Sequence, residues 1–336
     1  MSRRTEAERS VWVANQRTGG ARVTKVQRKR TVMNFVDWSF NEGILFNSIR
    51  EAPAETVRAF MQHLEEEGLS NATRHNQLAS IRRSMTALGA NPNSLGITAT
   101  LMGLPPRNRS GTKVPISDND YEEALAKAGK LDEPGLAIVL KLERLLGHRG
   151  LEGVMSIPDM EKFALEAKNL ASGSVSVTKG TKGGRHRITS VIKARALETL
   201  AVIRDALVFS REHGGFLIVG PKPGLKSARS KYHRLCRQVG LTGKSAPHSL
   251  RYSYVVEKIV ELRDAGFNKT EATSLVAQFI GHGPSRARYI TMVYGKTVVH
   301  TLPVERRKAR LDRAIVTVNK IVEGSSCPPF NANSCT

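Results

Sequence analysis

A histidine and an arginine three residues apart, His248 and Arg251, directly follow Pro247. Residues three apart share one face of a helix, and proline fits the first helical position, where its missing N–H group costs nothing. The start of a helix also presents free N–H groups and a partial positive charge. A histidine and an arginine placed there make a site suited to binding one phosphate.

Other sparse polar residues flank this pair in the sequence. Taken singly, each is more often part of a surface ion pair, a solvated helix edge or an ordinary turn. Those single interpretations do not explain why all of them fall in order within one basic region. The candidates for a joint site are Arg149, Glu152, Lys179, Lys182, His248, Arg251, His282, Tyr289 and Tyr294.

These residues resemble the catalytic domain of the tyrosine site-specific recombinases, the phage integrase family. Five boxes carry the resemblance: Gly147-His-Arg149-Gly-Leu-Glu152, Lys179-Gly-Thr-Lys182, His248-Ser-Leu-Arg251, Ile280-Gly-His282 and Ile290-Thr-Met-Val-Tyr294. Each box alone is a weak signal, but five in the family's order are a strong one. The resemblance spans about residues 26–300, because a helical bundle and a proline-rich linker precede the boxes, as in that family.

The resemblance implies a mainly α fold with two domains. A helical core-binding (SAM-like) domain would precede a mixed α/β catalytic domain with a small antiparallel sheet. It also implies a site-specific recombinase (integrase) of a mobile genetic element, which cuts and rejoins double-stranded DNA through a 3′-phosphotyrosyl intermediate. Such an enzyme needs no cofactor or metal, acts as a homo-tetramer on paired sites and can use accessory DNA-bending proteins. A type IB topoisomerase-like relaxing enzyme and a catalytically inactive DNA-binding regulator are the alternatives.

The chemistry of the two arginines and a tyrosine agrees with this interpretation. Cutting a phosphodiester without metal requires charge stabilisation on its non-bridging oxygens, and Arg149 and Arg251 can supply this through rigid, always-charged forks. A phenol nucleophile, Tyr294, forms a covalent phosphotyrosine that conserves bond energy, so ATP is not required.

Proton transfer can be assigned to the lysine and the two histidines. The leaving 5′ oxygen needs a proton, which Lys179 at a hairpin tip can deliver if neighbouring cations lower its pKa. His248 can act as acid or base for the tyrosine, and His282 can hydrogen-bond the phosphate. Glu152, one helical turn from Arg149, is better placed to orient a cation than to bind metal.

Two assignments stay open in the sequence. Lys182 lies on the same turn as Lys179 and is the alternative to it. Tyr289 follows His282 by seven residues and Tyr294 by twelve, and neither is the family's usual spacing. On one helix the two tyrosines would point about 140° apart, so only one could face the phosphate. Tyr294 is preferred because it completes the local motif.

The charge of the chain indicates a polyanionic partner. The 336 residues include 52 Lys and Arg against 30 Asp and Glu, a net charge of +22. Nucleic acid is the first candidate, and an anionic membrane surface is weaker, since the sequence has no apolar run of about 18 residues. The first residues lack the apolar core of a secretory signal, which predicts a cytoplasmic, nucleoid-associated protein. The three cysteines suggest neither disulfides nor a cysteine-based zinc site.

The predicted domain layout follows composition and periodicity. Residues 1–25 read as a basic N-terminal arm, either lying on DNA or merely solubilising, and 26–102 as the helical core-binding domain. Residues 103–116 are the linker, 117–300 the catalytic domain and 301–336 a C-terminal helix and tail. Basic residues repeating along helical faces are predicted to contact DNA phosphates. They are Arg74, Arg82, Arg83, Lys226, Arg229 and Lys231.

Local patterns also predict individual elements. Alternating β-branched residues over 174–178 and 187–192 predict a hairpin, and the apolar run 216–219 predicts a short strand. Three helices are predicted between residues 26 and 89, the third capped near Ser70. Further helices are expected over 121–130, 134–147, 160–170, 193–213, 223–239 and 303–323.

Overall fold

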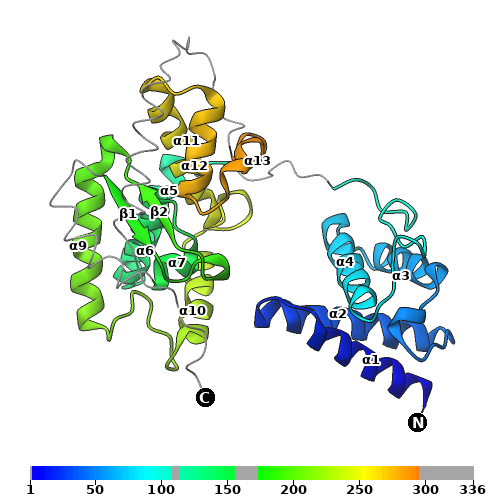
Figure 1. The fold of residues 1–336 in the computed structure, drawn as a ribbon. Coiled ribbons are helices and arrows are strands. Elements are labelled where there is room, and N and C mark those ends of the chain that lie inside the picture. Colours follow the sequence, from blue (N-terminus) through cyan, green and yellow to red (C-terminus); the bar gives the residue numbers. More distant parts are fainter. Residues whose placement is uncertain (1, 108–113, 156–172, 295–336) are drawn as a thin grey trace, which may run out of the picture. The chain divides into compact units, whose positions relative to one another are not determined.

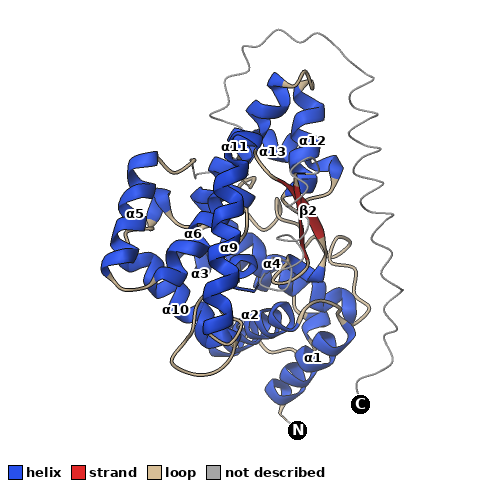
Figure 2. Cartoon of the chain, turned by 90° about the vertical axis from the view of Figure 1, so that its left-hand side faces the viewer, coloured by secondary structure: helices blue, strands red, loops and turns tan. Residues whose placement is uncertain are grey.

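Helices make up most of the chain in the computed structural model, which describes residues 2–107, 114–155 and 173–294 (Figures 1 and 2). Contacts divide the chain into two units, 1–109 and 110–336, so the boundary falls within the range of the predicted linker. The predicted helices at 160–170 and 303–323, and the predicted tail, lie outside the described residues. None of the described helices is long and apolar enough to cross a membrane.

The described part of the first unit has four α-helices and a short 3₁₀ turn around one apolar core. The phenyl ring of Phe35 lies at its centre, 5.1 Å from the ring of Phe60. Ser70 caps the fourth helix by accepting a hydrogen bond from the backbone N–H of Thr73, which confirms the prediction there. The helices are α1 (Arg3–Arg17), α2 (Arg22–Asn41), α3 (Ala54–Glu66) and α4 (Asn71–Ala87).

The structure shows a helix within residues 1–25, which the sequence predicts to be a basic N-terminal arm. Residues 3–17 form helix α1, which packs against α2 and α4 and belongs to the first unit. Its buried face consists of Ala7, Val11 and Ala14, which recur at helical spacing. In the sequence, the many charged residues around these three small apolar residues conceal their helical spacing. The basic side chains cover the outer face of a docked helix.

The second unit is built around helix α6 (Pro134–Leu146), most of whose residues are buried. It packs against α5, α7, α9 and α11. Gly147 ends the helix with a left-handed φ of +60°, and a side chain there would lie 2.5 Å from the Tyr254 ring, so only glycine fits. The other helices are α5 (Asp118–Lys130), α7 (Gly150–Met155), α9 (Ala196–Glu212), α10 (Leu225–Gln238), α11 (His248–Asp264), α12 (Lys269–Phe279) and α13 (Ala287–Val293).

The described part of the second unit contains one two-stranded antiparallel sheet, β1 (Ser174–Val177) and β2 (Arg187–Ser190). The predicted hairpin and the mainly α fold class are therefore confirmed. The predicted strand at 216–219 is wrong. Leu217 and Ile218 are buried, but their segment packs against the start of α6 at Gly135 and has no strand partner among the described residues.

Candidate active site

Arg251, on the first turn of α11, is fully buried, and both of its terminal nitrogens are held by backbone carbonyls. One donates to the Gly147 carbonyl at 2.5 Å, and the other donates to the Ile280 carbonyl after α12. Burial and the neighbouring Arg149 lower the pKa of Arg251 to about 10, so it stays charged at neutral pH. The fold thus fixes one guanidinium between the ends of α6 and α12.

Glu152 on α7 joins three arginines into one cluster. Its buried carboxylate lies 2.5 Å from Arg149 Nη1, 2.7 Å from Arg187 Nη2 and 3.7 Å from Arg251 Nη1. Burial pushes the pKa of Glu152 upward, but the adjacent Arg187 outweighs it and holds the pKa at about 2. One carboxylate facing three guanidinium groups leaves a positive excess, which suits an anionic phosphate.

His282 lies beside this cluster, one residue after Gly281. Arg149 Nη2 donates to the Ile280 carbonyl at 3.3 Å, and Arg251 donates to the same carbonyl, so the two arginines share one acceptor. Burial and the charges of Arg251 and Arg149 lower the pKa of His282 to about 4. Its imidazole is therefore neutral at pH 7 and can hydrogen-bond a phosphate oxygen without adding charge.

Both candidate tyrosines border the same cluster. The Tyr294 hydroxyl lies 3.3 Å from His248 Nε2, and its buried ring packs 4.3 Å from the ring of Tyr252. Tyr289, on α13, has its ring 5.3 Å from His282 and 6.2 Å from the ring of Tyr294. Among the described hydrogen bonds, the Tyr294 hydroxyl has one to a residue of the five boxes, His248, and the Tyr289 hydroxyl has none.

The two hairpin lysines, Lys179 and Lys182, are exposed on the connection between β1 and β2. Gly180 between them has a left-handed φ of +69°, and a side chain there would lie 2.5 Å from the Leu151 carbonyl. The turn is therefore seated directly on α7, which carries Glu152. The charge of Lys182 also contributes to the lowered pKa of His282.

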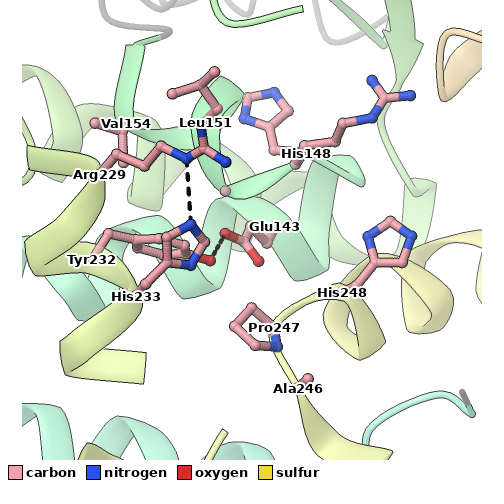
Figure 3. Close-up of a pocket in the computed structure, with 12 residues that line it drawn as sticks. Glu143, His148, Leu151, Val154, Arg229, Tyr232, His233, Ala246, Pro247 and His248 are labelled. Atoms are coloured by element: carbon pink, nitrogen blue, oxygen red, sulfur yellow. Dashed lines mark hydrogen bonds between the residues drawn. The ribbon is translucent and has the colours of Figure 1, made fainter. Parts of the chain in front are cut away.

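A cavity of about 390 Å³ adjoins the cluster and is lined by Arg149 and His248 together with residues of α6 and α10 (Figure 3). Within it, the Tyr232 hydroxyl donates a hydrogen bond to the carboxyl group of Glu143. Arg229 Nε also lies 3.4 Å from His233 Nε2 at its edge. The cavity brings an exposed arginine of α10 to the same side of the unit as the arginine cluster.

Some of the predicted DNA-contacting side chains are exposed, and others are already bonded to a partner within the protein. Arg83, Lys226 and Arg229 are exposed, and Arg82 is half-buried with its Nη2 2.6 Å from Asn93 Oδ1. Lys231 forms an ion pair with Glu133 at 2.7 Å.

Arg74 does not fit the expectation of a phosphate-facing arginine. Its side chain is buried, and its Nη2 pairs with Glu65 Oε1 at 2.7 Å, nine residues earlier on α3. Its guanidinium links two helices of the first unit. The sequence pattern places it on the basic side of α4, but the packing of α3 covers it.

Arg187 is the residue of the cluster that sequence analysis missed. It is the first residue of β2, and its buried side chain points to the same side of the strand as Thr189. A signal was present, because alternation along the strand gives residues 187 and 189 the same orientation. An arginine on the buried face of a strand requires a partner, and here that partner is Glu152.

The described residues contain no group of three or more His, Cys, Asp or Glu side chains able to hold a metal ion. The reactive groups that the fold assembles there are guanidinium, imidazole and phenol groups. This combination can bind a phosphodiester, stabilise added negative charge on it and present a nucleophilic oxygen.

Comparisons with known proteins point the same way as the geometry. The family model described as integrase matches residues 103–257. No match is found among curated protein sequences.

The solved structures similar to the chain include the following three. The Tn1549 transposon integrase in complex with transposon right end DNA has a TM-score of 0.57 and 13% identity, covering 91% of this chain and 98% of that one. The XerH site-specific recombinase bound to palindromic difH substrate has a TM-score of 0.50 and 18% identity, covering 88% and 80%. A lambda integrase dimer bound to a COC′ core site has a TM-score of 0.51 and 13% identity, covering 86% and 94%. At these identities the likeness concerns the fold.

Proposed function

We propose that this chain is a tyrosine recombinase of the integrase family, which cuts and rejoins double-stranded DNA at specific sites. The observation that carries the proposal is the Tyr294 hydroxyl 3.3 Å from His248, beside the arginines that surround Glu152. The structural relatives named above are bound to DNA, and the net charge of +22 supports the same partner here.

In the proposed cleavage step, Arg149 and Arg251 hold the two non-bridging oxygens of the scissile phosphate. His248 takes the proton of the Tyr294 hydroxyl as its oxygen attacks phosphorus. The bond to the 5′ oxygen breaks, and Lys179 gives that oxygen a proton. A 3′-phosphotyrosyl bond has then replaced a phosphodiester bond.

Rejoining reverses these transfers. A 5′-hydroxyl from the partner strand attacks the phosphotyrosine, its proton returns to the lysine and Tyr294 leaves as a phenol. One ester bond is exchanged for another at each step, so no energy source is consumed. His282 hydrogen-bonds the phosphate, and Glu152 orients the arginines.

Recombination between two sites requires four cleavages, so we propose a homo-tetramer on paired sites in the nucleoid of the cell. Exposed basic residues, Arg83 in the first unit and Lys226 and Arg229 in the second, would contact the DNA backbone. Accessory DNA-bending proteins are a further class of partner.

The experiment traps the covalent adduct. Nicked suicide duplexes, built on inverted repeats in the DNA flanking the gene, are incubated with the wild type, Tyr294→Phe and Tyr289→Phe. We expect a denaturation-resistant adduct with the wild type and Tyr289→Phe and none with Tyr294→Phe. The reverse pattern would transfer the nucleophile to Tyr289.

Two other outcomes would replace the proposed function. Tight, salt-sensitive DNA binding with no adduct from any variant would indicate a DNA-binding regulator. Relaxation of supercoiled plasmid by the wild type without paired sites would indicate a topoisomerase-like enzyme.

A further inference from the structure

Arg187 uses all of its terminal nitrogens inside the protein. Its Nη2 lies 2.7 Å from Glu152 Oε2 and 3.4 Å from the Gly147 carbonyl. Its Nη1 donates to the Phe279 carbonyl and to Thr189 Oγ1. Only 2% of the Arg187 side chain is exposed.

The acceptors of Arg187 are the same ones that hold the two phosphate-binding arginines. The Gly147 carbonyl accepts from both Arg187 and Arg251. Glu152 accepts from both Arg187 and Arg149. Phe279 directly precedes Ile280, whose carbonyl accepts from Arg149 and Arg251. Arg187 is therefore a third guanidinium held by the same set of acceptors, and it is nearly as buried as Arg251.

We propose that Arg187 is a positioning residue, which fixes Glu152 and the ends of α6 and α12 so that Arg149 and Arg251 present their guanidinium forks to the scissile phosphate. This inference rests on the proposed function. Arg187 does not touch DNA in this scheme, and its contribution is the orientation and ionisation of the Glu152 carboxylate. A misplacement of catalytic groups by about 1 Å can slow a reaction by about 100-fold.

The charge balance around Glu152 explains why an arginine is needed at this depth. Burial alone raises the pKa of Glu152, and Arg187 is the strongest influence in the opposite direction. Without Arg187, the carboxylate would hold a proton at a higher pH and lose its charge-assisted bond to Arg149. The described ionisable groups facing Glu152 include Glu143 on α6, His148 and Arg149 before α7, Arg187 on β2 and Arg251 on α11.

The test compares single-turnover adduct formation by Arg187→Met and by Arg185→Met at saturating suicide duplex. Arg185 is exposed on the same hairpin, two residues away, and its replacement removes the same charge. We expect Arg187→Met to form the adduct about 10- to 100-fold more slowly, with a DNA dissociation constant within about threefold of the wild type. Arg185→Met should form it at close to the wild-type rate.

The pH profile separates positioning from a merely structural role. Between pH 8 and pH 5, the rate of Arg187→Met should fall more steeply than that of the wild type, because Glu152 becomes protonated. Arg187→Met/Glu152→Gln should lose this extra pH dependence, since the titrating group is gone. Because removal of one partner from a buried ion pair can unfold a protein, Arg187→Lys is tested beside them. Lysine keeps the positive charge but lacks the guanidinium fork. Arg187→Lys should therefore form the adduct slowly but show the pH profile of the wild type.

The proposal is overturned if folded Arg187→Met matches the wild type in rate and pH profile. It is also overturned if the loss only follows the folded fraction measured by circular dichroism. Absence of an adduct with the wild type would instead refute the proposed function, so the two failures are distinguishable.

Discussion

Glu143, buried in α6, makes the stability of the second unit depend on pH. Its only described hydrogen bond is from Tyr232, and burial raises its pKa from 4.5 to about 8. The folded protein therefore keeps this carboxyl group protonated at neutral pH, whereas the unfolded chain ionises it above pH 4.5. The stability contribution of Glu143 is complete below pH 4.5 and is lost as the pH rises to about 8.

The size of this loss follows from the two pKa values. Each pKa unit between the folded and unfolded states corresponds to about 1.4 kcal/mol, so the whole effect is about 5 kcal/mol. Of this, roughly 3 to 4 kcal/mol falls between pH 5 and pH 8. For a unit of this size, that loss corresponds to a melting temperature lower by roughly 7–14 °C at pH 8.

The perturbation is Glu143→Gln, which removes the ionisation and keeps an acceptor for the Tyr232 hydroxyl. We expect the variant to melt at the wild-type temperature at pH 5 and well above it at pH 8, measured by calorimetry on the DNA-free chain. Glu122→Gln, an exposed glutamate on α5, is the matched control and should follow the wild type throughout. His148, whose pKa burial lowers to about 3, acts in the opposite direction but is present in every variant, so it cancels in the difference. Parallel melting profiles for the wild type and Glu143→Gln would refute the reasoning.

Two further predictions concern the catalytic groups. Arg251→Lys should slow adduct formation by at least about 100-fold, because an ammonium group cannot bond the Gly147 and Ile280 carbonyls and a phosphate with one rigid fork; a loss below threefold in single-turnover assays would contradict the proposed role. Lys179→Ala should slow cleavage of a normal suicide duplex and recover on a duplex with sulfur at the 5′ leaving position, since a thiolate leaves without a proton. Recovery of Lys182→Ala instead would assign the proton to that lysine.

The sequence by itself determined the chemistry and much of the local structure. Helix starts such as Ser70 and Ser117 and the hairpin over 174–190 are set by neighbouring residues, which a linear pattern displays. The five boxes predicted which residue types would meet, because their chemistry is specific to phosphate transfer. The mainly α fold class, which the structure confirms, followed from the same local signals.

Tertiary structure alone decided which charged residues are buried and what they contact. Arg187 reaches the Phe279 carbonyl 92 residues away, and Arg74 is covered by α3. Helix α1 docks through three small apolar residues hidden among charges, and residues 216–219 are buried without a strand partner. The physical reason is common to all of these. Local periodicity shows which face a side chain occupies, but whether that face meets water, DNA or another helix depends on contacts between residues distant in the chain.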